Sequence, residues 1–371
     1  MELKVLHVVQ PTEGGAPRCA VDLAADQARR GWSVSVACPS EEPALGWLRD
    51  AGVPHIEWQA RRSPATALDE TRQLSQIISA TTPTLVHLHS AKAGLTGRLA
   101  MRGSLPTIYQ PHAWSFHAAG GVMRKAAVMF ERRAARWSDA ILCVSKGEAA
   151  LGVSAGIKGA FEVIPNGVDV EGWPFADDVR RAEARTKLGL HSGPLVVCLG
   201  RITEQKGQDL LLAAWPGIEN EVPGARLILV GDGPSRSEWE PLAAPSVTFA
   251  GQSSDPRSWL AAADLVVLPS RWEGMSLTML EAMASGRPVV STDVDGAVEA
   301  LGEEAGAIVP VGDTARLASE IVRRLKDPAR RVTEGLAARR RIETHFDLRL
   351  TFERTASLYE KVLERRKDLY R

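Results

Sequence analysis

Two acidic side chains, eight residues apart, lie at the centre of the sequence pattern that points most directly to chemistry. Glu273 follows the apolar run Leu265–Leu268, and Glu281 falls a turn or so inside a helix predicted to begin near Ser276 or Leu277. The free amides of that helix start would face the same space. Carboxylates accept hydrogen bonds from the vicinal hydroxyls of a ribose or hexose. The segment therefore predicts a sugar-binding loop, although acids near a helix start are also favoured by the helix dipole alone.

Two cations follow another apolar run, Leu195–Leu199. Arg201 comes directly after Gly200, and Lys206 precedes Gly207, where a helix is expected to begin. A guanidinium can bridge two phosphate oxygens and an ammonium supplies a compact charge, so the pair suits a diphosphate. A pair of solvated surface cations is the alternative.

Paired glycines follow the first apolar run, Lys4–Val9. Gly14 and Gly15 precede the helical pattern Ala16–Arg30, so a ligand phosphate could approach the backbone and the helix amides. The segment lacks the G-x-G-x-x-G spacing and the later acidic residue of dinucleotide-binding proteins. A tight turn that needs positive φ is the alternative.

Short apolar runs alternate with helical patterns along most of the chain, which is typical of parallel sheets covered by helices on both faces. In the first half, the strand candidates are Lys4–Val9, Ser33–Ala37, Leu85–Leu88, Thr107–Tyr109, Ala140–Val144 and Glu162–Ile164. In the second half, they are Pro194–Leu199, Arg226–Val230, Val247–Ala250, Leu265–Leu268, Pro288–Ser291 and Ala307–Val309. Ligands bind beyond the carboxyl ends of strands in such sheets, where these motifs lie.

The polar segment Asp169–Ser192 separates the two alternations and indicates a linker that leads into a short helix. We therefore predict a Rossmann-like N-terminal domain over residues 1–175 and a second over residues 190–345. The charged but partly apolar segment 346–371 is predicted to form a helix that packs back on the first domain. Two such sheets facing each other would make a cleft.

Taken in order, these motifs resemble those of glycosyltransferase family 4, a retaining family with the GT-B fold. Glu273 to Glu281 resembles its E-x7-E motif, and Gly200-Arg201 with Lys206-Gly207 resembles its G-R-x4-K-G pattern. Further resemblances run over nearly the full length: the Gly14-Gly15 loop, His112 in Tyr109–Ala113, Ile164–Asp169 as I-P-N-G-V-D, and Gly231–Pro234 as G-x-G-P. Departures are Pro17 in place of Glu, and Met275-Ser276 in place of the commoner Phe-Gly.

The resemblance implies a role for each of these residues. Glu273 would bind hydroxyls of the donor sugar, Glu281 the ribose, and His112 the transferred sugar. Arg201 and Lys206 would neutralise the diphosphate leaving group. The implied catalytic residues are thus His112, Glu273, Arg201 and Lys206. The implied donor-binding residues are Gly14, Gly15, Gly200, Gly274, Met275, Ser276, Leu277, Thr278 and Glu281.

The expected activity is therefore retaining transfer of a hexose-type sugar from a nucleotide diphosphate donor, with UDP-sugar the commonest family donor, without a metal or other cofactor. The acceptor would be a glycan, a lipid-linked molecule or a small molecule, as in polysaccharide biosynthesis. A nucleotide-sugar epimerase on the same fold is the open alternative. An NAD-dependent oxidoreductase lacks the dinucleotide fingerprint, and a non-catalytic sugar-binding protein has no need for the cations and glutamates.

The tripeptide Asp293-Val294-Asp295 matches the D-x-D metal motif of a different glycosyltransferase fold. It follows a strand candidate and precedes a helix expected near Gly296, so we interpret it as a turn with Asp295 as helix N-cap. The family resemblance would place Gly where Asp295 stands, which leaves the donor contacts of this loop open.

Composition excludes several function classes. The 45 basic and 45 acidic residues give no global field that would attract nucleic acid. The cysteines, Cys19, Cys38, Cys143 and Cys198, have no metal-ligand spacing and suggest buried thiols in a reducing compartment. With no signal-peptide pattern and no apolar run of about 18 residues, a cytoplasmic protein is expected.

One region leaves a peripheral contact with the inner face of the membrane open. Residues 71–130 contain no Asp or Glu but include His87, His89, His112 and His117. Beyond Trp114 and Phe116, Met123, Ala126, Ala127, Phe130, Ala134 and Trp137 recur at helical spacing, interleaved with Arg124, Lys125, Arg132, Arg133 and Arg136. Such a basic amphipathic helix with exposed aromatics could rest on anionic lipid. A core helix with a solvated basic face is the alternative.

Overall fold

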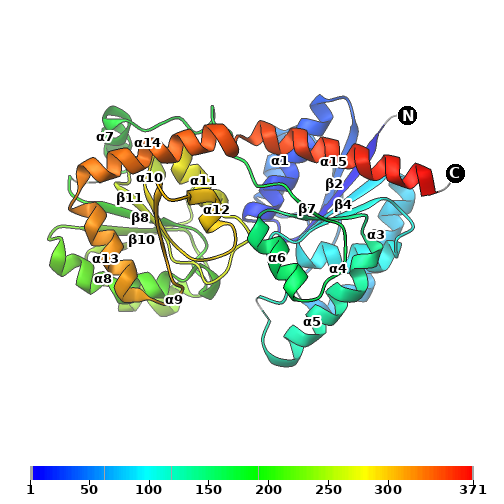
Figure 1. Cartoon of the computed structure of the whole chain (residues 1–371), viewed down its shortest axis with the longest axis horizontal. Helices are drawn as coiled ribbons and strands as arrows, with labels where there is room; N and C mark the ends of the chain where they lie inside the picture. Colours follow the sequence, from blue (N-terminus) through cyan, green and yellow to red (C-terminus); the bar gives the residue numbers. More distant parts are fainter. Residues whose placement is uncertain (1–2, 62, 118, 191, 370–371) are drawn as a thin grey trace. The chain divides into compact units, whose positions relative to one another are not determined.

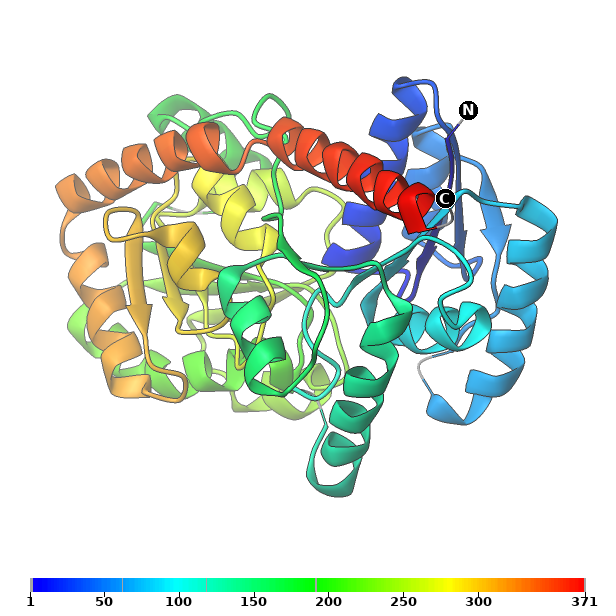
Figure 2. The same ribbon diagram turned by 45° about the vertical axis from the view of Figure 1, so that its right-hand side comes forward.

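The computed structural model describes residues 3–61, 63–117, 119–190 and 192–369 (Figures 1 and 2). It divides into two compact units: unit 1 comprises Met1–Asn166 and Thr351–Arg371, and unit 2 comprises Gly167–Leu350. The predicted domains also include seven positions that lie outside the described residues: 1, 2, 62, 118, 191, 370 and 371.

Unit 1 is built on a parallel sheet that has seven strands among the described residues, in the order β3-β2-β1-β4-β5-β6-β7. The strands are β1 Lys4–Val9, β2 Ser33–Cys38, β3 His55–Glu57, β4 Leu85–His89, β5 Thr107–Gln110, β6 Ala140–Cys143 and β7 Phe161–Val163. The helices are α1 Gly15–Arg29, α2 Ala44–Asp50, α3 Ala67–Thr81, α4 Ser90–Met101, α5 Gly121–Ala134, α6 Lys146–Ser154 and α15 Leu348–Leu369, with 3-10 turns at Pro64–Thr66 and Ala135–Trp137.

Both faces of the unit 1 sheet are covered, as the near-continuous apolar strands predict. Along β1, Val5 and Val9 join a buried cluster that includes side chains of α1 and α15, whereas Leu6 and Val8 join a second cluster that includes side chains of α3 and α4. Because successive strand residues point to opposite faces, His7 falls on the face covered by α1 and α15.

Unit 2 repeats this layout with a parallel sheet of six strands among its described residues, in the order β10-β9-β8-β11-β12-β13. The strands are β8 Leu195–Leu199, β9 Arg226–Val230, β10 Val247–Gly251, β11 Leu265–Leu268, β12 Val289–Thr292 and β13 Gly306–Val309. The helices are α7 Asp178–Lys187, α8 Gln208–Glu221, α9 Arg236–Trp239, α10 Pro256–Ala262, α11 Leu277–Ala284, α12 Ala297–Leu301, α13 Thr314–Leu325 and α14 Pro328–His345, with 3-10 turns at Glu204–Lys206 and Glu240–Leu242.

Both sheets contain the strand order 3-2-1-4-5-6, counted within each unit. The order reverses between β1 and β4 in unit 1 and between β8 and β11 in unit 2. Ligands of open α/β sheets bind at such reversal points, beyond the carboxyl ends of the strands. The predicted α/β class with two Rossmann-like sheets is confirmed, and the strand order selects the loops after β8 and β11 as the place for a ligand in unit 2.

The last helix, α15, begins in unit 2, and its residues from Thr351 onward belong to unit 1. The Tyr359 hydroxyl lies 2.6 Å from Nδ1 of His87, and the Arg366 guanidinium forms bonds of 2.6 and 3.0 Å to the Asp139 carboxylate. Figure 1 shows the red end of the chain crossing α1. None of the helices among the described residues is long and apolar enough to cross a membrane.

Candidate active site in the loops after β8 and β11

The predicted cation and carboxylate of unit 2 form one ion pair. Nζ of Lys206, at the end of the loop after β8, lies 2.5 Å from Oε1 of Glu273 in the loop after β11. The same carboxylate oxygen accepts a hydrogen bond of 2.9 Å from the Ser270 hydroxyl. The two side chains are 23% and 12% exposed, so the pair is largely shielded but still reaches solvent. Charge of both signs is thus concentrated at the reversal point of the strand order.

The two loops are also joined through their backbones. Arg271 donates its backbone N–H to the Gln205 carbonyl at 2.7 Å, and its guanidinium binds both carboxylate oxygens of Asp209 at 2.8 and 2.6 Å. The Gln205 amide donates to the Trp272 carbonyl at 3.2 Å. Bidentate Arg–carboxylate pairs fix geometry as well as charge. The loops that carry Lys206 and Glu273 are therefore held as one body.

A close backbone approach explains why Gly207 stands next to Lys206. Gly207 adopts φ of 67° and is the N-cap of α8, and a Cβ at this position would lie 2.1 Å from the Pro269 carbonyl oxygen. The 3-10 turn that carries Lys206 consequently sits against the end of β11. Gly231 likewise allows a close backbone approach next to Arg201. A Cβ at Gly231 would lie 2.1 Å from the carbonyl oxygen of Gly200.

Helix α11 begins where the sequence predicts, directly after the Glu273 loop. Ser276 is its N-cap, and the hydroxyl accepts a hydrogen bond from the backbone N–H of Met279. Gly274 and Met275 are buried, whereas Ser276, Leu277 and Thr278 are half-buried. Amides at a helix start favour anions. Glu281 follows one turn on and is half-buried, so a loop carboxylate, a helix start and a helical carboxylate belong to one continuous segment.

Arg201 follows β8 and Gly200, and its side chain is half-buried. Gly200 donates its N–H to the Val230 carbonyl, and the Arg201 carbonyl accepts a 3.0 Å bond from the Gln208 amide. These bonds fix the backbone of the β8 loop. The predicted unit 2 residues, from Gly200 to Glu281, thus lie on the two loops after β8 and β11 and on the helix α11 that follows.

The interpretation of Asp295 as a helix N-cap is wrong. The N-cap of α12 is Gly296, which has φ of 76° and whose Cβ would lie 2.4 Å from the Gly274 carbonyl oxygen. Only glycine allows this close approach of the two loops, so the helix begins one residue later than an Asp295 cap requires. Burial raises the pKa of Asp295 to about 6, with the charges of Glu299 and Asp293 adding to the rise.

The remaining predicted residues belong to unit 1. Gly14, at φ 91°, is the N-cap of α1, and Gly15 is the first helical residue; both are exposed. The space where a Cβ of Gly14 would point is open. His112 has φ of 59°, which is uncommon for a residue with a side chain. Burial lowers the pKa of His112 to about 3, so its imidazole is neutral.

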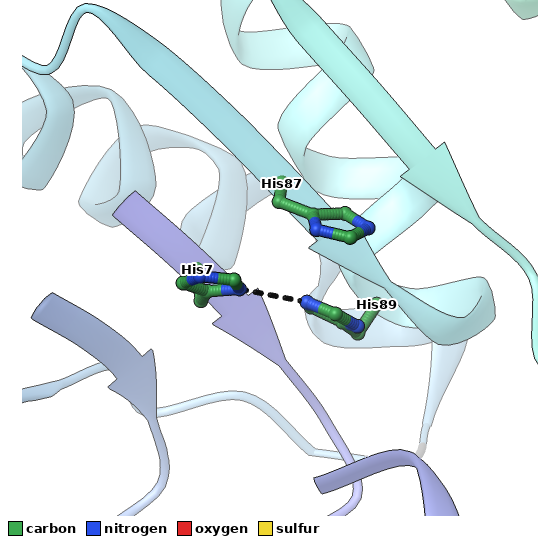
Figure 3. A group of neighbouring side chains, drawn as sticks. All are labelled: His7, His87 and His89. Carbon is green, nitrogen blue, oxygen red and sulfur yellow. Dashed lines mark hydrogen bonds between the residues drawn. The ribbon is translucent and has the colours of Figure 1, made fainter. Parts of the chain in front are cut away.

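A buried histidine cluster in unit 1 was not predicted from the sequence, where His87 and His89 were noted only as part of an acid-free stretch that could meet anionic lipid. His7, His87 and His89 are fully buried and therefore add nothing to such a surface. Figure 3 shows the three rings side by side. The signal was present in the strand periodicity. The register pairs His7 with His87, and His89 is two residues further along β4, so all three side chains share one face.

Helix α5 also differs from both sequence interpretations. Trp114 and Phe116, proposed as exposed aromatics, are buried. On the helix itself, Ala134 is buried, but Met123 is 60% exposed, which does not fit a core helix. Val122 and Met129 are 82% and 68% exposed. The first two turns of α5, basic and apolar together, therefore face solvent.

Comparison with known proteins agrees with this arrangement. A model described as Glycosyltransferase Family 4 matches residues 13–171, and one described as Glycosyl transferases group 1 matches residues 193–327. The GDP-mannose-dependent alpha-(1-6)-phosphatidylinositol monomannoside mannosyltransferase of Mycolicibacterium smegmatis is 32% identical over 268 residues, 67% of this chain and 69% of that protein. The chain belongs to glycosyltransferase family 4.

Two other relatives match different shares of the chain. A GDP-mannose-dependent monoacylated alpha-(1-6)-phosphatidylinositol monomannoside mannosyltransferase of Corynebacterium glutamicum is 32% identical over 54% of this chain, and the match spans only 56% of that protein. The alpha-maltose-1-phosphate synthase of M. smegmatis is 29% identical over 94% of this chain and 96% of that protein.

Solved structures show the fold of this family 4 chain. Anabaena HepE in complex with UDP-glucose superposes with a TM-score of 0.86, at 22% identity over 97% of this chain and all of that one. Sucrose-phosphate synthase from Thermosynechococcus elongatus gives 0.83, at 23% identity over 98% of this chain and all of that one. With the two parallel sheets, these likenesses confirm the predicted GT-B fold.

Proposed function

We propose that this chain transfers a hexose-type sugar, with retention, from a nucleoside diphosphate donor to a glycan, a lipid-linked molecule or a small molecule. The observation that carries the proposal is the Lys206–Glu273 pair beside the start of α11, at the reversal point of the unit 2 sheet. A diphosphate bound there would meet Lys206, Arg201 and the first amides of α11. Glu273 would accept hydrogen bonds from hydroxyls of the donor sugar, and Glu281 from the ribose.

The proposed chemistry follows the charges. As the bond between the anomeric carbon and the phosphate oxygen breaks, negative charge develops on the diphosphate and positive charge on the sugar ring. Cations fixed before the reaction stabilise the developing negative charge without reorganisation. The acceptor hydroxyl bonds to the anomeric carbon from the same face, and its proton passes to the departing phosphate oxygen. Lys206 and Arg201 supply the countercharge, so the proposal invokes neither a metal nor another cofactor.

The nucleotide base of the donor can be identified from the stabilisation that each ligand gives. A ligand that binds the folded state raises the melting temperature, and the stabilisation grows with the logarithm of ligand excess. UDP, GDP and ADP and their common sugars are compared in one thermal-shift series. The relatives named above include GDP-mannose-dependent enzymes, and HepE was solved with UDP-glucose. We expect one diphosphate to stabilise the protein and Lys206→Ala to abolish most of that shift. No shift with any of the three would contradict the proposal.

Transfer is tested with the stabilising donor and a panel of glycan and lipid-linked acceptors. Product that appears only when an acceptor is present supports a transferase. Conversion of the donor sugar without any acceptor would instead favour the epimerase alternative.

We also propose that α5 rests on an anionic membrane, which would bring a lipid-linked acceptor to unit 1. The support is the exposure of Val122, Met123 and Met129 beside basic residues of the same helix. Apolar side chains can enter the lipid boundary while cations meet anionic headgroups. The wild type should sediment with anionic liposomes at low salt, and alanine at all of Arg124, Lys125, Arg132, Arg133 and Arg136 should abolish this.

A liposome comparison separates the apolar from the electrostatic part of this contact. Met123→Ser and Met129→Ser should weaken sedimentation while leaving net charge unchanged. Alanine at Arg316 and Arg323 on α13 of unit 2 serves as a control for loss of positive charge alone. Wild-type protein that stays in the supernatant at low salt would end the membrane proposal.

A further inference from the structure

We propose that a chain of three hydrogen bonds, running from Gln27 through His7 and His89, holds His112 in one tautomer that presents a bare Nδ1 to the sugar. The inference rests on the proposed function in one respect only, the contact of His112 with the transferred sugar that the family resemblance implies. Gln27, His7 and His89 would then be positioning residues for the reaction.

The contacts form an unbroken line inside unit 1. Oε1 of Gln27 lies 2.9 Å from Nε2 of His7. Nδ1 of His7 lies 2.9 Å from Nε2 of His89, the bond drawn in Figure 3. Nδ1 of His89 then lies 3.1 Å from Nε2 of His112. Gln27, His7 and His89 are at most 2% exposed, so water does not compete for the first two bonds, and the third ends at the half-buried His112.

The direction of the line is set at Gln27. An amide oxygen only accepts, so Nε2 of His7 must carry a hydrogen. Burial raises the pKa of the Tyr359 hydroxyl, and the Gln27 side chain acts in the opposite direction, as an amide N–H facing that hydroxyl would. The contact with His7 and this effect on Tyr359 agree on the same orientation of the Gln27 amide.

Each neutral imidazole has one N–H and one lone pair, so the direction passes along the line. His7 donates from Nε2 and accepts at Nδ1, which requires His89 to donate from Nε2. His89 accepts at Nδ1, which requires His112 to donate from Nε2. Nδ1 of His112 is then an acceptor, suited to a sugar hydroxyl. The opposite tautomer would present an N–H at that position.

The rings stay neutral, as this argument needs. Burial lowers the pKa of His7 to about 4 and that of His112 to about 3. It lowers the pKa values of His87 and His89 well below the usual range, with the neighbouring histidine charges adding to the effect. A doubly protonated ring would break the direction of the line, and these surroundings disfavour it at neutral pH.

A metal ion is the competing explanation for His7, His87 and His89, whose nitrogens lie within 4.8 Å of one another. The geometry favours hydrogen bonding. Metal ligands point lone pairs in the ring plane at one centre. His87 instead lies against the face of His89, with ring centroids 4.0 Å apart and planes at 32°, and its Nδ1 contacts Tyr359. The facing nitrogens of His7 and His89 are occupied by their mutual bond.

The experiment determines which ring nitrogen of each histidine carries the proton, by long-range proton–nitrogen NMR. The sample is the full chain labelled with ¹⁵N-histidine, without donor, at about pH 7.5, where neutral rings are expected. His112→Gln assigns the His112 signals. We expect His112 to be protonated at Nε2 alone. A protonated Nδ1 in the wild type overturns the proposal and needs no further variant. Because no donor is present, this result is independent of whether the chain transfers sugar.

Two variants test the origin of the tautomer. Gln27→Met removes the terminal acceptor, so His112 should become a mixture of tautomers. If half of the molecules then present the wrong nitrogen, kcat/KM for transfer should fall about twofold, since only the competent fraction reacts, while diphosphate affinity stays unchanged. His87→Phe is the matched control, since it alters the same buried cluster but leaves the three bonds in place; it should keep the single tautomer.

Either a single Nε2-protonated His112 in folded Gln27→Met or a mixed tautomer in His87→Phe would overturn the proposal. A stoichiometric zinc titration decides the remaining alternative. Coordinated loss of the His7, His87 and His89 signals at one equivalent would replace the hydrogen-bond chain with a metal site, whereas unchanged signals support the proposal.

Discussion

Lys206 and Glu273 neutralise each other across 2.5 Å, although they lie on loops that follow two different strands. The Ser270 hydroxyl bonds to the same carboxylate oxygen, so the carboxylate is already oriented before any ligand arrives. A diphosphate would compete with Glu273 for the Lys206 ammonium. We therefore expect donor binding to redistribute this pair.

Loss of either partner should abolish most transfer while the protein stays folded. Removing one group that stabilises developing charge typically costs about 10²- to 10³-fold in kcat, and we expect that range for Lys206→Ala and Glu273→Ala. Lys206→Arg should retain more activity because it keeps the charge. The readout is steady-state transfer, with circular dichroism to verify folding.

A control pair has the same separation elsewhere in unit 2. Nζ of Lys326 lies 2.5 Å from Oε2 of Glu221, but both side chains are more than half exposed. Exposed pairs contribute little, so Lys326→Ala should transfer at the wild-type rate. Near wild-type rates in both site variants would overturn the assignment of Lys206 and Glu273.

Substitution of Gly207 should destabilise the protein through a backbone clash. In Gly207→Ala the new methyl would lie 2.1 Å from the Pro269 carbonyl oxygen at φ of 67°. The left-handed conformation alone costs about 1–2 kcal/mol, and the clash adds to it. We expect a loss of more than about 2 kcal/mol in urea unfolding and weaker diphosphate binding, because the loops after β8 and β11 must separate.

The matched substitution is Gly217→Ala, ten residues further along the chain. Gly217 is exposed in α8, and its Cβ would meet open space. Alanine inside a helix should stabilise by about 0.5–1 kcal/mol. A Gly207→Ala protein as stable as Gly217→Ala would show that the loops are not held together as described.

Stability should fall steeply as the pH drops below 6.5, because of the buried histidines. Their pKa values are lowered in the folded state, to about 4 for His7 and about 3 for His112, from 6.5 when unfolded. Between these values the unfolded chain binds protons that the folded chain does not. The free energy of unfolding then decreases as pH falls, by up to about 1.4 kcal/mol per pH unit for each histidine. Above 6.5 the effect vanishes.

Urea titrations from about pH 7.5 to pH 5 test this dependence in wild type and His87→Phe. The pKa of His87 also lies well below its usual value because of burial. The variant should lose stability less steeply than the wild type, since one proton fewer is taken up on unfolding. If the free energy of unfolding has the same pH dependence in both proteins, the His87 imidazole has the same pKa in the folded and unfolded states, which would contradict the prediction. Carboxylates contribute equally to both proteins and cancel in the comparison.

Sequence periodicity was sufficient for the parts of the fold whose elements are predominantly apolar. β1, β9 and β11 match the predicted ranges, and α11 begins after Ser276, where the sequence predicted a helix start. β3 was missed because its three residues, His55–Glu57, are not buried and carry no apolar run. Exposed edge strands are specified by their neighbour rather than by their own pattern.

The elements that carry the candidate site were predictable where spacing along the chain carries the information, and less so where contacts join distant segments. The β8 and β11 loops were selected from the residues that follow each strand, but the Lys206–Glu273 pair depends on strand order. His7 and His87 are 80 residues apart and meet only through the register of β1 with β4. The Asp295 interpretation failed because a backbone contact at Gly296, invisible in local sequence, decides where α12 begins.

The return of α15 to unit 1 bears on how the protein is made. Leu358, Tyr359 and Val362 complete the apolar layer over Val5 and Val9, yet they follow the whole of unit 2 in the chain. At ribosomal rates, about 10 to 40 s separate the synthesis of Asn166 from that of Thr351. During that interval, the apolar face of unit 1 that α15 will cover is exposed to solvent. Unit 2 therefore has time to fold before unit 1 is complete.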